Sequence, residues 1–68
     1  MTFDHPVFCR IEYWSPIAAD WWVGHAGTNL MDPEKYVTKV TETGKIARAV
    51  VVETGEVIYP KGYGAEVL

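Results

Sequence analysis

One well-marked helix between two pairs of strand patterns constrains the fold of this chain more than any other feature of its sequence. The helix signal begins at Asp32, a favourable N-cap, and continues with Pro33 at the first helical position. It ends at Gly44, because glycine most often closes a helix at the C′ position. A helix of about 11 residues is marginal alone, so it must dock on a sheet.

Strand patterns precede and follow this helix. Residues 7–14 alternate between two faces, and the set predicted to lie under the helix is Val7, Cys9, Ile11 and Tyr13. Residues 21–26 are predicted to form a second strand, and residues 45–53 and 56–59 a second hairpin. The run 50–52 favours a central strand, whereas Pro60 places the end of the last strand at a sheet edge.

These patterns predict an α+β fold of order ββαββ, with a four-stranded, mainly antiparallel sheet and one helix packed on one face. At 68 residues the chain has room for one core. Residues 1–60 are expected to form this single domain, and residues 61–68 a flexible C-terminal tail.

The charge and cysteine content limit the classes of partner and location. The formal net charge is −3 at pH 7, so no general attraction to nucleic acid or to anionic lipid is expected. No apolar stretch approaches the length of a membrane span. The single cysteine forms no internal disulfide and is typical of a reducing cytoplasm, which is the predicted location.

No catalytic, cofactor-binding or metal-binding residues are predicted. Cys9 falls in the apolar register of the first strand, where a buried structural thiol is expected rather than a nucleophile. Cys9, His5 and His25 lack the paired spacing of zinc ligands. The carboxylates, Glu12 included, are assigned to solvated surface. The chain is therefore expected not to be an enzyme.

Four large aromatic residues are left without a chemical role. Tyr13-Trp14 ends the first strand and Trp21-Trp22 begins the second, and neighbours on a strand point to opposite faces. Tyr13 and Trp21 are expected inward, with Trp14 and Trp22 outward, although alternation alone leaves the choice between Trp21 and Trp22 open. Two interpretations of these four rings are compatible. Large rings add buried apolar area to the core of a small domain, and rings that stay exposed are typical anchors of protein interfaces.

The functional hypothesis is a small non-enzymatic protein-interaction module. Its predicted contact surface consists of Arg10, Trp14, Trp22 and Tyr59. The partner is expected to be another protein or a second copy of the chain. Two alternatives stay open: a homodimer with a purely structural role, and a nucleic-acid-binding domain in which arginines and aromatic rings hold the bases.

Four segments carry a resemblance to a known group of proteins. They are Arg10-Ile11-Glu12-Tyr13-Trp14-Ser15-Pro16, Asp32-Pro33-Glu34-Lys35-Tyr36-Val37, Gly44-Lys45-Ile46-Ala47-Arg48 and Thr54-Gly55-Glu56-Val57-Ile58. With them, residues 7–59 resemble small uncharacterised accessory proteins of bacteriophages that infect actinobacteria. The resemblance assigns no functional residues. It implies a viral protein in the host cytoplasm that binds and redirects a host protein.

Overall fold

The helix begins and ends where its capping residues predict. The computed structural model describes residues 4–63, in which α1 spans Pro33–Glu42. The Asp32 carboxylate accepts a hydrogen bond of 3.1 Å from the backbone N–H of Lys35, as an N-cap does. Gly44 has a φ of 103°, in the left-handed region that glycine favours after a helix. Both predicted boundaries are confirmed.

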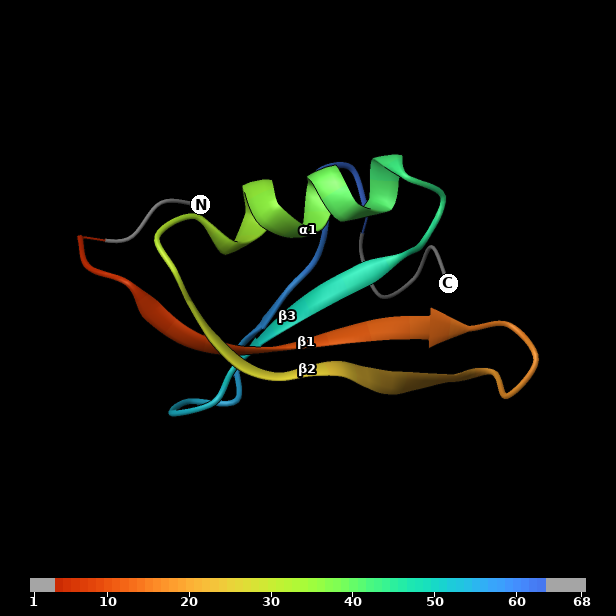
Figure 1. Cartoon of the computed structure of the whole chain (residues 1–68), viewed down its shortest axis with the longest axis horizontal. Helices are drawn as coiled ribbons and strands as arrows, with labels where there is room; N and C mark the ends of the chain where they lie inside the picture. The colour runs from red at the N-terminus through yellow and green to blue at the C-terminus, as the bar shows by residue number, and fades with distance from the viewer. Residues whose placement is uncertain (1–3, 64–68) are drawn as a thin grey trace.

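The four strands form one antiparallel sheet. They are β1 (Val7–Ser15), β2 (Asp20–Leu30), β3 (Ala47–Val51) and β4 (Val57–Ile58). Their order in space is β2-β1-β3-β4, and α1 crosses one face of the sheet (Figure 1). The predicted ββαββ fold is therefore confirmed. β3 is internal and buries Val50 and Val51, while β4 lies at an edge just before Pro60.

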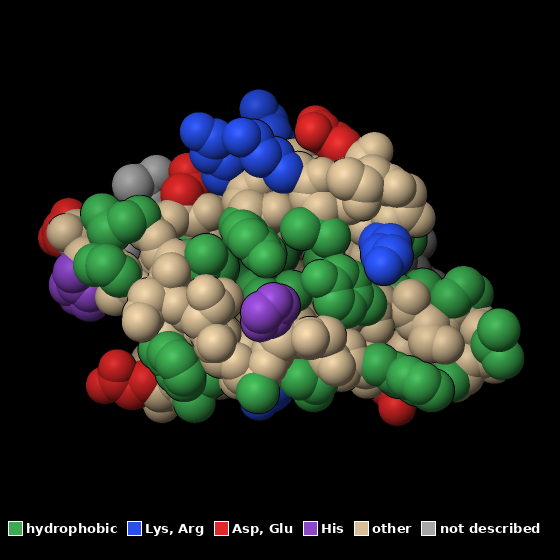
Figure 2. Space-filling model, viewed as in Figure 1, with side chains coloured by type: hydrophobic (Ala, Val, Ile, Leu, Met, Phe, Trp, Pro, Cys, Tyr) green, Lys and Arg blue, Asp and Glu red, His purple; other side chains and the backbone are tan. Residues whose placement is uncertain are grey.

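The hydrophobic core lies between α1 and the sheet. Its buried members are Cys9, Ile11, Val37, Ala47, Ala49, Val51 and Ile58. Burial raises the pKa of the Cys9 thiol, so the reactive thiolate is scarce and the predicted structural role fits. The outer side of α1 instead carries the exposed lysines Lys35 and Lys39. Hydrophobic side chains are exposed over the sheet below the helix (Figure 2).

The second strand continues to Leu30, beyond its predicted end at residue 26. Its pairing with β1 shifts register on both sides of Ile11, so β2 accommodates extra residues as bulges. Gly24 lies against the ring of Tyr13, and Gly27 lies against the ring of Phe8. These glycines therefore do not end the strand. They leave room for rings that pack across it.

The chain stays attached to the helix beyond the last strand. Pro60 is buried, and the backbone N–H of Lys61 donates a 2.8 Å hydrogen bond to the Thr38 hydroxyl. The first residues of the predicted tail, 61–63, therefore follow the domain surface, while residues 64–68 lie outside the described residues. No helix within residues 4–63 is long and apolar enough to cross a membrane.

Candidate functional site

The side of the sheet away from α1 is left uncovered by any helix of the described residues, and we call it the open face. Cross-strand pairing places Glu12 of β1 opposite Arg48 of β3, and Trp14 opposite Trp21 of β2. Residues paired in this way share a face of the sheet. The open face thus brings charged and aromatic side chains from several strands together.

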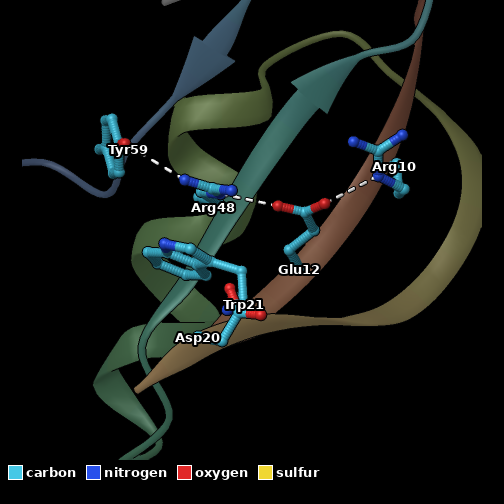
Figure 3. A network of polar contacts seen from close by, with 6 residues as sticks. All are labelled: Arg10, Glu12, Asp20, Trp21, Arg48 and Tyr59. Atoms are coloured by element: carbon cyan, nitrogen blue, oxygen red, sulfur yellow. Dashed lines mark hydrogen bonds and ion pairs between the residues drawn. The ribbon is translucent and has the colours of Figure 1, made fainter. Parts of the chain in front are cut away.

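A nearly buried carboxylate lies at the centre of the open face. Glu12 is only 7% exposed, and its two oxygens accept hydrogen bonds from Nε of Arg48 at 2.7 Å and Nε of Arg10 at 2.9 Å (Figure 3). A carboxylate removed from water is costly unless it is paired in this way. Burial by itself raises the pKa of Glu12, but the hydrogen bonds and charges of the two arginines outweigh it and hold the pKa below its ordinary value of 4.5.

Trp21 links this ion cluster to the surrounding rings. The Arg48 guanidinium lies 4.2 Å from the centre of the Trp21 ring, a cation–π contact. Trp14 and Tyr59 meet Trp21 edge to face, at centroid distances of 5.4 Å and 6.3 Å. Arg48 also donates a long hydrogen bond of 3.4 Å to the Tyr59 hydroxyl. We call these six residues the open-face cluster: Arg10, Glu12, Trp14, Trp21, Arg48 and Tyr59.

Three of the four residues predicted to form the contact surface belong to the open-face cluster, and one does not. Arg10, Trp14 and Tyr59 are members. Trp22 pairs with Tyr13 on the helix side, and the expectation that Trp21 faces inward is wrong. The pairing of Ser15 with Asp20 across the turn decides this, because it sets Trp14 opposite Trp21. Trp22 is still 62% exposed, since α1 packs over β1 and β3 rather than β2.

The sequence did not predict the two ion pairs of the open-face cluster, which join Glu12 to Arg10 and to Arg48. Glu12 was expected on solvated surface, and the structure instead buries it between two arginines. Its pairing with Arg10 had a visible signal, because residues two apart on a strand share a face. Its pairing with Arg48 spans 36 positions and depends on the register between β1 and β3, which no local pattern reveals.

Exposed apolar side chains surround the open-face cluster. Phe8, Val23 and Val57 lie in its register and are 36–56% exposed. Two arginines and one glutamate give the cluster a local charge of +1, whereas the whole chain carries −3. The open face therefore combines apolar surface with a small positive centre.

Fold and surface together define a class of protein, a small α+β domain with one uncovered sheet face. Comparisons with protein-family models, with curated proteins and with solved structures find no significant match. Among residues 4–63, no three His, Cys, Asp or Glu side chains are grouped so that they could hold a metal ion.

The ion cluster predicts how stability depends on pH. Because the pKa of Glu12 is lowered on folding, its contribution is complete above the ordinary value of 4.5 and is lost as the pH falls through the folded pKa. Urea unfolding of the wild type and of Glu12→Gln, from neutral pH down to about pH 3, should show a stability difference that shrinks with acidity. A difference that stays constant would contradict the assigned pKa.

Proposed function

We propose that this chain is a small non-enzymatic protein-interaction module that contacts its partner through the open face. The observation that carries the proposal is the exposure of Phe8, Val23 and Val57 around the ordered open-face cluster. Several exposed apolar side chains on one face of a domain are typical of an interaction site, and Trp, Tyr and Arg are the residues that most often anchor one.

Within the cluster, Arg10 is the side chain best suited to contact a partner. Glu12 engages its Nε, and the side chain is 38% exposed. The carboxylate holds the guanidinium in one orientation, so less conformational entropy is lost when a partner binds. Arg48 is less accessible because Trp21 and Tyr59 cover it. The proposed contact surface is therefore Arg10, Trp14 and Tyr59 with Trp21 in place of Trp22, and with the exposed apolar residues around them.

The nature of the partner follows from the resemblance to phage accessory proteins. It implies that the partner is a host protein in the bacterial cytoplasm, and the single cysteine agrees with a reducing compartment. Neighbouring genes for phage structural or replication proteins would support this setting. Neighbouring genes of ordinary cellular metabolism would contradict it.

The two alternative functions have less support from the open face. A stacked base would need a free aromatic surface, and Trp21 already carries Arg48 against its ring. A homodimer through the open face would bring the +1 centres of two copies together, which is unfavourable. Light scattering over a concentration range tests self-association directly.

Replacing the exposed valines tests the proposed surface. Val23→Ser with Val57→Ser should reduce partner retention about tenfold, because exposed apolar contacts are removed at little cost to folding. The measurement is capture from a lysate of the source organism or its host on the immobilised chain, with mass spectrometry of the retained proteins.

Ile17→Ser is the matched control. Ile17 is fully exposed in the turn between β1 and β2, away from the open face. The proposal expects the control to retain the same proteins as the wild type. If the double variant also retains them, or if the wild type retains none, the open face is not a protein-binding surface.

A further inference from the structure

A groove lies at the C-terminal end of α1, beside the hairpin of β1 and β2. It has a volume of about 560 Å³. Its walls come from the end of β1, from β2 and from the loop after the helix, and they include Tyr13, Ser15, Pro16, Trp22, Lys45 and Ile46. A volume of this size is typical of sites that hold small molecules.

Backbone contacts hold the walls of this groove in place. The N–H of Trp14 donates a 2.9 Å hydrogen bond to the carbonyl of Ile46, which ties the loop after the helix to β1. The Tyr13 ring packs over Gly24 and against the hydrophobic core. The groove is therefore formed before any ligand arrives, so binding costs little reorganisation.

The charge of the groove distinguishes it from other hollows on the surface. Lys45 is the one charged side chain among its lining residues, and its Nζ lies 5.7 Å from the centre of the Tyr13 ring. Within residues 4–63, no carboxylate forms an ion pair with this ammonium group. The hollow along α1 and the one beside β4 instead combine lysines with carboxylates, Glu34 among them.

The groove also offers an exposed aromatic ring, that of Trp22, as a binding surface for a ligand. Trp22 pairs with Tyr13 across the two strands and leaves most of its ring in solvent. A flat apolar group placed against Trp22 would remove much of that surface from water. An anionic group on the same molecule would meet the Lys45 ammonium.

We propose that this groove binds a small aromatic carboxylate, with its ring against the exposed Trp22 ring and its carboxylate at Lys45. The site lies mainly on the helix side of the sheet, although Trp14 and Val23 of the open face also line it. Its recognition residues, Trp22 and Lys45, are not part of the proposed contact surface. It does not depend on the proposed protein interaction, and the two proposals can fail independently.

Three probes with the same ring and different charge test this assignment. They are phenylacetate, 2-phenylethanol and phenethylammonium, titrated into the ¹⁵N-labelled chain while the amide signals of the groove residues are followed by NMR. Phenylacetate should bind about fivefold more tightly than the alcohol, because a charge-assisted hydrogen bond to Lys45 is added. The cation should bind most weakly.

Variants of the groove separate the contribution of the Lys45 charge from that of the Trp22 ring. Lys45→Gln should reduce phenylacetate binding to the level of the alcohol and leave the alcohol unchanged. Trp22→Ala should weaken the binding of both, and the exposure of Trp22 makes unfolding of this variant unexpected. Lys39→Gln, on the exposed side of α1, is the matched control and should change neither.

Four results would overturn the proposal. They are no shifts at the groove with phenylacetate, tightest binding of the cation, an unchanged phenylacetate affinity in Lys45→Gln, and a much stronger preference for a peptide. For the last, N-acetyl-Ala-Phe presents the same ring and carboxylate on a peptide backbone. If it binds more than about tenfold tighter than phenylacetate, the groove is a peptide-docking site.

Discussion

Replacing Gly24 with alanine is expected to lower the free energy of unfolding by about 2–3 kcal/mol, the upper part of the range for overpacked sites. The added Cβ would lie 1.7 Å from Cε2 and 2.2 Å from Cδ2 of Tyr13. Gly24 is not among the glycines with positive φ, so alanine's backbone preference adds little and the cost is steric. The Tyr13 ring cannot leave freely, because it packs against the hydrophobic core.

Urea unfolding followed by circular dichroism measures this loss, and two other glycines serve as controls. Gly27→Ala places a Cβ 2.2 Å from the tip of the Phe8 ring, which is about half exposed and free to move, so about 1 kcal/mol or less is expected. Gly55→Ala meets no atom within 4 Å but has a φ of 78°, so about 1 kcal/mol of backbone strain is expected. Equal losses for Gly24 and Gly27 would show that ring packing does not control the effect.

Glu12→Gln is expected to cost about 2 kcal/mol at neutral pH, below the range for breaking a fully buried ion pair. The substitution leaves Arg48 without its anionic partner, and the side chain of Arg48 is only 20% exposed. The cost stays below that range because Arg10 is partly in water and can be solvated again.

Thermal and urea unfolding of matched variants test this ion cluster. Arg10→Gln should cost about 1 kcal/mol or less, because Arg10 is the more exposed partner of Glu12. Glu56→Gln removes an exposed carboxylate elsewhere and should change stability by no more than about 0.5 kcal/mol. If Glu12→Gln were as stable as the wild type, the cluster would contribute nothing to folding.

The candidate site was only partly visible in the sequence. Arg10 and Trp14 alternate with the core residues of β1, so their place on the opposite face followed from the strand period alone. The contacts of Arg48 and Trp21 did not follow, because they join three strands and depend on cross-strand register. The groove beside Lys45 depends on how the loop after α1 is held to β1, which is also a tertiary contact.

The sequence by itself determined the order of the elements, both ends of α1 and the inward register of β1. Each rests on local signals: a capping side chain at Asp32, a left-handed glycine at Gly44, and alternation along one strand. Only the tertiary structure decided the length of β2, the burial of Glu12 and which of Trp21 and Trp22 faces the helix. The physical reason is that all three depend on which residues meet across strands, and a chain's local pattern does not fix that register.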